Sequence, residues 1–245
     1  MLALIDIGAE FWKNYFGSKS AVTAYELTLE RIDWYRHVDC RTVVCCDSPK
    51  SKRKEWYAEY KSNRPPKPAD AIESLIAVQQ RAASWGIPVV QCDGYEADDL
   101  IAALASQAWP EEVQIVGSEK DFFCLIGDTV KLVGKHGLIG SNECFEKFGV
   151  LPCQMTDWLA LVGDTADAIP GCPNCGPGRA TTLLERFETL ELLRAASDED
   201  ILSVPGVGKK TLESLRAWDP SLALRLVRLL DDAPVSLDTL WSSAA

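Results

Sequence analysis

The sequence has very little histidine, no net positive charge and no long apolar run. Only two of its 245 residues are histidine, His37 and His136, and they stand far apart. A zinc site built on histidine pairs therefore lacks its ligands. No apolar run approaches the ~18 residues that cross a bilayer. We expect a cytoplasmic protein with no membrane partner.

Cysteine is present but does not form the pattern of a secreted protein. A disulfide framework is typical of small secreted chains, whereas this chain has 245 residues and nine cysteines. Several cysteines lie inside apolar runs, where a free thiol packs as a small hydrophobic group. Cys172 and Cys175 have zinc-like spacing, but no second pair follows. We expect reduced structural thiols.

The charge is uneven along the chain. The net charge of −11 and the pI near 4.7 argue against a nucleic-acid partner when taken alone. Between Lys50 and Lys67, however, seven bases face two acids, a local balance of +5. The stretch from Lys50 to Arg64 has a helical pattern that Pro65 stops, and a solvated charged helix is the simpler interpretation. An acidic chain with one basic stripe suits a metal-dependent enzyme acting on a polyanion.

Strand and helix patterns alternate over the first ~140 residues, which predicts a mainly parallel, doubly wound α/β sheet. The expected strands are Leu2–Ile5, Thr42–Cys46, Val89–Gln91, Val113–Val116 and a hairpin of 130–133 with 138–139. The expected helices are Ala24–Arg36, Asp70–Trp85 and one from about residue 100 to Ala108, with a mixed, aromatic-rich segment after the first strand.

Carboxylates follow four of the expected strands. They are Asp6, Asp47, the group Glu96, Asp98 and Asp99, and the pair Glu119 and Asp121. Loops at the carboxyl ends of parallel strands meet at one edge of the sheet. Any single acid is equally well a helix cap or a surface charge. Four strand ends carrying acids together favour a functional site.

The second half is helical and contains two glycine-rich turns. The helix Met155–Val162 leads into Gly163-Asp164-Thr165-Ala166-Asp167. The two turns contain Gly171, Gly176, Gly178 and Arg179, and then Gly206, Gly208, Lys209 and Lys210. A helix start after a glycine turn offers backbone amides to a phosphate. Tight turns between packed helices are the alternative, but two of them favour a module that follows a phosphodiester backbone without reading bases.

The carboxylates predict the metal. Oxygen ligands without histidine or cysteine suit Mg²⁺ or Mn²⁺. With Asp164 and Asp167 the set reaches nine acids, too many for one ion. Two ions roughly 4 Å apart would neutralise them and hold the attacking and leaving oxygens of a phosphodiester displacement. A base from the 50–67 stretch would stabilise charge on the phosphate.

These motifs together resemble the 5′-nuclease (flap endonuclease) family, which includes the 5′→3′ exonuclease domain of bacterial DNA polymerase I and stand-alone phage enzymes. The matching motifs are Leu4-Ile5-Asp6, Arg53 with Tyr60-Lys61-Ser62-Asn63-Arg64-Pro65-Pro66, Gly94-Tyr95-Glu96-Ala97-Asp98-Asp99, Glu119-Lys120-Asp121, and Gly163-Asp164-Thr165-Ala166-Asp167-Ala168-Ile169-Pro170-Gly171. Their order and spacing agree over roughly residues 1 to 240.

The resemblance implies a PIN-like nuclease domain over residues 1–150 with a basic helical arch at about 50–68. A helix-three-turn-helix module would follow over 151–230, and a tail over 231–245 would pack back on the nuclease domain. It implies Asp6, Asp47, Glu96, Asp98 and Asp99 around a first metal, and Glu119, Asp121, Asp164 and Asp167 around a second. It also implies Arg53, Tyr60, Lys61 and Arg64 as catalytic arch residues.

The resemblance further implies a monomer that cleaves DNA with a 5′ flap or 5′ end, including an RNA–DNA primer junction. A K⁺ ion would sit at the 171–178 turn, and any coupling to a polymerase would be in trans. Glu119 stands where relatives usually have Asp, Cys172 and Cys175 where they have apolar residues, and Arg179 where they have Lys. A non-catalytic protein that binds branched DNA and a PIN-type ribonuclease are the alternatives.

Overall fold

The computed structural model describes residues 1–38, 40–117 and 119–241, which form two compact units. The first unit comprises Met1–Lys52, Pro65–Gly140 and Leu229–Ala245, and the second comprises Arg53–Arg64 and Ser141–Arg228. The sequence-based boundaries placed residues 53–64 with the nuclease domain, whereas they group here with residues 141–228.

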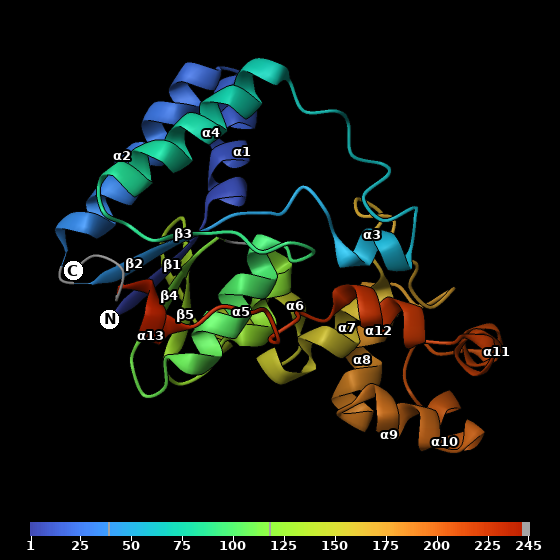
Figure 1. The fold of residues 1–245 in the computed structure, drawn as a ribbon. Helices are drawn as coiled ribbons and strands as arrows, with labels where there is room; N and C mark the ends of the chain where they lie inside the picture. Colours follow the sequence, from blue (N-terminus) through green and yellow to red (C-terminus); the bar gives the residue numbers. More distant parts are fainter. Residues whose placement is uncertain (39, 118, 242–245) are drawn as a thin grey trace. The chain divides into compact units, whose positions relative to one another are not determined.

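The first unit is built on a six-stranded sheet of order β3-β2-β1-β4-β5-β6 (Figure 1). The strands are β1 Leu2–Asp6, β2 Arg41–Cys45, β3 Val89–Val90, β4 Val113–Val116, β5 Val130–Gly134 and β6 Gly137–Ile139. All neighbouring strands are parallel except β5 and β6, which form the expected hairpin. The mainly parallel α/β fold predicted from the sequence is confirmed.

Helices cover both faces of this sheet, with α1, α2 and α4 on one face and α5 on the other (Figure 1). The helical elements are α1 Ile7–Ser18, α2 Ala21–His37, α4 Ala69–Ser84, α5 Ala97–Gln107, the 3₁₀ helix η1 Lys120–Leu125 and α13 Leu237–Leu240. The main core lies between the sheet and helices α1, α2 and α4, where Ile5, Phe11 and Val44 are buried. Because helices cover both faces of the sheet, the strand sequences are continuous apolar runs.

Helix α1 was not expected from the sequence. Its aromatic residues come in adjacent pairs, such as Phe11 with Trp12, so they give no clean helical period. Two glycines, Gly8 and Gly17, further lower its intrinsic helix preference. The helix start is encoded by Asp6, whose Oδ1 accepts a hydrogen bond from the backbone amide of Ala9 at 2.8 Å.

The second unit is helical. Its elements are α3 Lys52–Trp56, α6 Ser141–Phe148, the 3₁₀ helix η2 Pro152–Gln154, α7 Met155–Val162, α8 Pro177–Phe187, α9 Leu190–Ala195, α10 Asp198–Leu202, α11 Lys209–Ala217 and α12 Ser221–Val227. Its core is formed by buried leucines such as Leu161, Leu184 and Leu226. In the part of the chain that the structure describes, no helix is long and apolar enough to cross a membrane.

The basic stretch is less helical than its pattern predicts. Only Lys52–Trp56 is α-helical, and residues 58–63 form turns. Lys61 has a φ of 56°, which interrupts any right-handed helix. The amide of Ser62 bonds to the carbonyl of Glu59 at 2.9 Å, a turn contact. The helix that the pattern predicted over 50–64 is therefore present only in its first part, because turns replace the rest.

Candidate functional site

The sheet has its topological switch point between β1 and β4. From β1 the chain crosses to β2 on one side and returns later to β4 on the other. Asp6 ends β1, Asp47 follows β2, and Glu96 comes before α5 on the chain leaving β3. Open α/β sheets bind ligands at this position. The fold thus brings the predicted acids of the first unit to one edge, hereafter the carboxylate edge.

Asp6 and Asp47 form the best-defined pair on the carboxylate edge. Backbone amides anchor both side chains, since Asp6 accepts from Ala9 at 2.8 Å and Asp47 accepts from Ala97 at 3.0 Å. Gly8 lies between them: a methyl group there would lie 3.4 Å from Oδ1 of Asp6 and 3.6 Å from Oδ2 of Asp47. Gly8 thus leaves a small space that both carboxylates border.

The thiol of Cys46 reports the same concentration of negative charge. Burial raises its pKa to about 12, and the charges of Asp47 and Asp6 add to the shift. The pKa of Cys45 is raised as well, first by burial and then by neighbours that include Asp6. Both cysteines therefore stay as neutral thiols beside the carboxylate edge, in agreement with the expectation of structural thiols.

The acidic stretch 96–99 forms the first turn of α5. Glu96 is the N-cap residue, and it forms a reciprocal capping box with Asp99. The amide of Glu96 donates to Oδ2 of Asp99 at 3.0 Å, and Oδ1 of Asp98 accepts from the amide of Asp99 at 2.9 Å. A helix N-terminus stabilises this negative charge. Glu96 and Asp99 are buried, and Asp98 is half-buried.

Glu119 and Asp121 follow β4, the strand next to β1. Glu119 precedes η1 as its N-cap residue, and Asp121 lies in the first turn of that helix. Gly117 holds the end of β4 close to Asp6, because a methyl group at Gly117 would lie 3.5 Å from Cβ of Asp6 and 2.9 Å from the ring of Phe122. The chain therefore leads into Glu119 and Asp121 from the same edge.

The donor chemistry of the carboxylate edge fits a hard divalent cation. Among the described residues no three His, Cys, Asp or Glu side chains converge into one metal-binding group. Two carboxylates do border the space above Gly8. Mg²⁺ is usually held in this way, by one or two carboxylates with water and substrate phosphate, and not by a cage of protein ligands. The residues present therefore fit Mg²⁺ or Mn²⁺ better than zinc.

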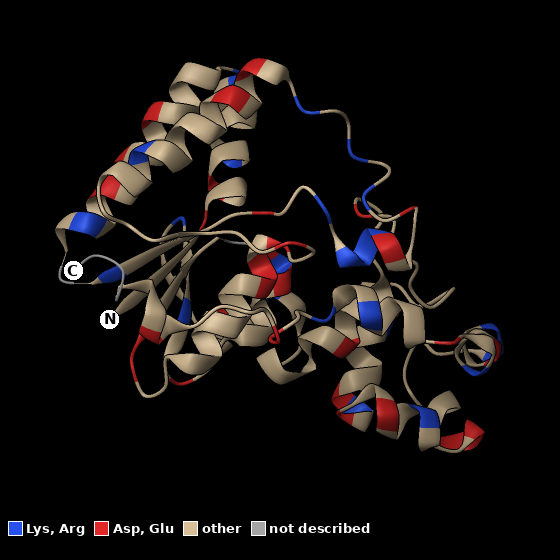
Figure 2. Ribbon diagram, in the orientation of Figure 1, with Lys and Arg blue, Asp and Glu red and all other residues tan. Residues whose placement is uncertain are grey.

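The start of the basic stretch is fastened to the acidic stretch within the first unit. The amide of Lys52 donates to the carbonyl of Gly94 at 2.9 Å, and its ammonium lies 3.5 Å from the ring centroid of Tyr95. Lys50 forms an exposed ion pair with Asp93 at 3.0 Å. Figure 2 shows acidic residues at the start of α5 and basic residues on the segment between α3 and α4.

Arg53 and Tyr60 are enclosed within the second unit. Arg53 is only 2% exposed, and its guanidinium donates to the carbonyls of Leu226 and Arg228, both at 2.9 Å. These are carbonyls at the end of α12, so Arg53 satisfies a helix C-terminus. Tyr60 is also buried. The catalytic role predicted for Arg53 receives no support from these surroundings, which are those of a structural residue.

Asp164 and Asp167 lie on a tight loop of the second unit. Asp164 and Ile169 pair through two backbone hydrogen bonds of 2.8 and 2.9 Å, and Oδ1 of Asp164 accepts from the amide of Ala166. Two glycines make the loop possible. A methyl group on Gly163 would lie 2.4 Å from the amide nitrogen of Gly171, and one on Gly171 would lie equally close to Val162.

Arg64 is bound to this loop. Its guanidinium contacts Oδ1 of Asp167 through Nε at 2.7 Å and Nη2 at 2.6 Å. The amide of Lys61 donates to the carbonyl of Asp167 at 2.9 Å, and the side chain of Asn63 donates to Thr165. The contact joins a guanidinium to a carboxylate, so it is charge-assisted, and Asp167 is buried. Lys61 extends over the ring of Tyr60, at 4.9 Å from its centroid.

The two glycine-rich turns have the same backbone design. In each, the backbone amide of one buried residue donates to the carbonyl of another buried residue three positions earlier. Cys175 donates to Cys172, and Val207 donates to Val204, both at 3.1 Å. The residue before the second buried one has positive φ, and a glycine then begins the next helix. These residues are Asn174 with φ 60° and Gly206 with φ 80°, followed by Gly176 before α8 and Gly208 before α11.

Side chains connect the two turns. The guanidinium of Arg179 donates to the carbonyl of Gly206 at 2.8 Å and to that of Asn174 at 3.1 Å. The amide side chain of Asn174 also donates to the hydroxyl of Ser214 on α11, at 2.8 Å. Arg179 therefore holds both turns in one arrangement, in addition to any contact with a ligand.

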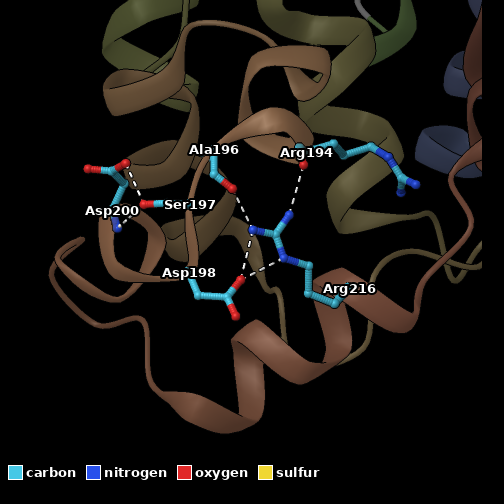
Figure 3. A network of polar contacts seen from close by, with 6 residues as sticks. All are labelled: Arg194, Ala196, Ser197, Asp198, Asp200 and Arg216. Atoms are coloured by element: carbon cyan, nitrogen blue, oxygen red, sulfur yellow. Dashed lines mark hydrogen bonds and ion pairs between the residues drawn. The ribbon is translucent and has the colours of Figure 1, made fainter.

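Arg216, on the helix that follows the second turn, forms a network of polar contacts with the α9–α10 junction (Figure 3). Its guanidinium donates to the carboxylate of Asp198 at 2.9 Å and to the carbonyls of Arg194 and Ala196. At the same junction Ser197 caps α10 through the amide of Asp200. Arg216, on α11 after the turn, thus links that helix to the junction between α9 and α10, which precedes the turn.

Cys172 and Cys175 form the apolar part of the first turn. Both are buried, and their thiols share a hydrogen bond that raises the pKa of Cys172 and lowers that of Cys175. The positive charge of Arg179 also lowers the pKa of Cys175. They stand where the second turn has Val204 and Val207, so they fill an apolar position.

Several residues that shape the carboxylate edge, the Asp164 loop or the glycine-rich turns were not identified from the sequence. Gly8, Gly163 and Asn174 act through backbone shape, and Arg216 acts through a network between three helices. A signal existed for the first two, because Gly8 follows Asp6 closely and Gly163 begins the Gly-Asp-Thr-Ala-Asp motif. Nothing local in the sequence marks the partners of Arg216.

The fold and the site define a class of protein: a doubly wound α/β sheet with an acidic switch point, followed by a helical unit with paired glycine turns. Two family models match adjacent parts of the chain. Residues 2–149 match the 5′-3′ exonuclease, N-terminal resolvase-like domain, and residues 150–242 match the 5′-3′ exonuclease, C-terminal SAM fold. The chain belongs to the 5′-3′ exonuclease family, as its motifs predicted.

Individual relatives agree with this assignment. The chain is 35% identical over 227 residues to DNA polymerase I of Deinococcus radiodurans, covering 87% of this chain and 24% of the relative. It is 32% identical over 200 residues to a 5′-3′ exonuclease of Aquifex aeolicus, covering 80% of this chain and 66% of the relative. The chain thus spans about a quarter of the polymerase relative.

A solved structure shows the same fold. The T5 D15 protein, co-crystallised with metal ions, superposes with a TM-score of 0.77 at 22% identity, covering 94% of this chain and 89% of that one. D15 from bacteriophage T5 is also described as a flap endonuclease in a complex with DNA and metal ions.

Proposed function

We propose that this chain is a divalent-metal-dependent nuclease that hydrolyses DNA phosphodiester bonds at 5′ ends and 5′ flaps. The observation that carries the proposal is the convergence of Asp6 and Asp47 on the space above Gly8, at the switch point of the sheet. Membership of the 5′-3′ exonuclease family supports it, and so does the DNA complex described for the T5 protein.

The residues have separate roles in this proposal. Asp6, Asp47, Glu96 and Asp98 offer oxygens to Mg²⁺ or Mn²⁺, and Glu119 and Asp121 extend the acidic edge from β4. The metal, when bound, would generate a hydroxide nucleophile and stabilise the leaving oxygen. Asp164 and Asp167 keep their predicted ligand role as a proposal. Lys61, which is held by backbone contacts in the turn region, would contact the scissile phosphate.

The paired turns of the second unit would bind the DNA backbone. Gly176 and Gly208 have no side chain, so neither helix start is capped by its own N-cap residue, and the first-turn amides suit a phosphate. Gly178, Lys209 and Lys210 lie in the first turns of these helices, and Gly171 precedes the first glycine-rich turn. A K⁺ ion at residues 171–178 belongs to the same proposal. Contacts of this kind follow a backbone and do not read bases.

A 5′-labelled flap substrate tests the proposal directly. We expect cleavage with Mg²⁺ or Mn²⁺ and none with EDTA. Binding without cleavage in both metals would favour the non-catalytic DNA-binding alternative. Cleavage of single-stranded RNA in preference to the DNA flap would favour the PIN-type ribonuclease. Comparing a blocked with a free 5′ end then separates exonuclease from flap activity.

A further inference from the structure

Asp99 differs from the other acids of the carboxylate edge in how its oxygens are used. It is 0% exposed. Oδ2 accepts a hydrogen bond from the amide of Glu96 at 3.0 Å, and Oδ1 accepts one from the amide of Leu230 at 2.8 Å. Each oxygen therefore already holds a backbone donor. Hydrogen bonds from backbone amides to an ionised carboxylate are stronger than those between neutral groups.

The bond to Leu230 is part of a longer contact along α5. The hydroxyl of Tyr95 donates to the carbonyl of Asp232 at 3.3 Å. At the other end of the helix, the Gln107 side chain donates to the carbonyl of Val235 and accepts from the amide of Leu237, both at 3.0 Å. Residues 229–237, hereafter the strap, thus run beside α5 from its first turn to its last.

The first turn of α5 depends on the same carboxylate. Asp99 holds the amide of Glu96, and the Glu96 side chain returns a bond to the amide of Asp99. Oδ1 of Asp98 accepts from that amide as well. The orientation of two proposed metal ligands is therefore tied to the residue that also anchors the strap.

We propose that Asp99 is a positioning residue and not a metal ligand: it clamps the strap to α5 and thereby orients Glu96 and Asp98. This inference rests on the proposed function for its catalytic consequence. The clamp itself is independent of catalysis, because it consists of two hydrogen bonds to backbone amides. It gives residues 229–237 a role in the nuclease centre, although they are more than a hundred positions away in sequence.

The test compares Asp99→Asn with its neighbour Asp98→Asn. An asparagine side chain has one acceptor oxygen, so Asp99→Asn can hold only one of the two amides. In metal-free buffer we expect its unfolding midpoint to fall by roughly 5 °C and hydrogen exchange of the Leu230 amide to rise at least tenfold. Mn²⁺ affinity, measured by electron paramagnetic resonance, should change less than threefold.

For Asp98→Asn we expect the opposite: Mn²⁺ affinity at least tenfold weaker, with the metal-free midpoint and Leu230 exchange unchanged. At saturating Mn²⁺ and well below the midpoint, Asp99→Asn should lower kcat about tenfold with little change in KM for the flap. Gln107→Ala, which releases only the far end of the strap, should raise Leu237 exchange while leaving Leu230 protected.

Three results would overturn the proposal. One is a tenfold loss of Mn²⁺ affinity in Asp99→Asn with a normal metal-free midpoint, which is the behaviour of a ligand. Another is rapid exchange of the Leu230 amide in the unsubstituted protein. The third is an unchanged kcat in Asp99→Asn at saturating Mn²⁺.

If Asp99→Asn does not fold without metal, a structural role is supported, since removing a repelling ligand charge would stabilise the metal-free folded state. Failure of the proposed function is distinct, because it appears as no cleavage by the unsubstituted protein.

Discussion

The carboxylate edge of the first unit and the paired turns of the second unit hold the groups proposed to act on DNA by opposite means. At the edge these groups are side chains, and backbone amides hold them, as Ala9 holds Asp6. In the turns these groups are backbone amides, and side chains hold the backbone, as Arg179 holds Gly206. Under the proposed function, a substitution at the edge would remove chemistry, whereas one in the turns would change shape or DNA binding.

This contrast explains the composition of each region. Like charges gathered at one edge repel, so each needs a donor or a cation to stay in place. Asp167, in the second unit, is held instead by the guanidinium of Arg64. The turns carry basic side chains and no acidic ones, and they need glycine or asparagine where φ is positive. The predictions below separate the two kinds of region, from the largest expected effect to the smallest.

Asp98→Ala should abolish cleavage and leave flap binding nearly intact. Loss of a charge that helps hold a catalytic metal lowers rates by about 10³-fold or more. Single-turnover cleavage at saturating enzyme measures the rate, and fluorescence anisotropy in Ca²⁺ measures binding. Comparable loss of binding and rate would remove the distinction between the edge and the turns, and full activity would contradict the site assignment.

Gly163→Ala should destabilise the second unit by about 3 kcal/mol or more, because φ is 73° and the new methyl group would lie 2.4 Å from a backbone nitrogen. Chemical denaturation measures the change. Gly178→Ala is the matched control, since a methyl group there meets nothing within 4 Å. Equal stability of the two variants would show that the tight loop relaxes easily.

Replacing Lys209 and Lys210 together by alanine should weaken DNA binding roughly tenfold at moderate salt, whatever the base sequence. The slope of log affinity against log salt should fall by about 2, one for each phosphate that a lysine no longer neutralises. The rate at saturating DNA should stay the same. Substituting the exposed bases Lys135 and Lys147 serves as a charge-matched control. A lower saturating rate would give the second turn a part in the chemistry.

Cys172→Val with Cys175→Val should change stability by less than about 1.5 kcal/mol, because it gives the first turn the residues of the second, Val204 and Val207. Thermal unfolding and flap binding measure the outcome. A large loss would show that the thiol–thiol hydrogen bond, and not apolar packing, maintains the first turn.

The sequence predicted the alternation of strands and helices, because buried parallel strands are continuous apolar runs and proline and glycine mark their ends. It also predicted which acids follow strands, since that order is local. Helix α1 was not predicted, because it is stabilised by the burial of Phe11 and Trp12 and its sequence lacks a clear helical period. The arch helix was overestimated, because a favourable local pattern did not reveal the turns that dock Lys61 and Arg64.

By itself, the sequence determined the family, the parallel α/β fold and the set of acids and glycine turns, since each depends on local pattern and spacing. Only the tertiary structure decided how each group is used. It buried Arg53 against the end of α12, bound Arg64 to Asp167, and gave both oxygens of Asp99 to backbone amides. The reason is physical: a charged side chain has the same local signal whether its partner is a metal, a phosphate or a distant backbone group, and only the folded chain brings that partner to it.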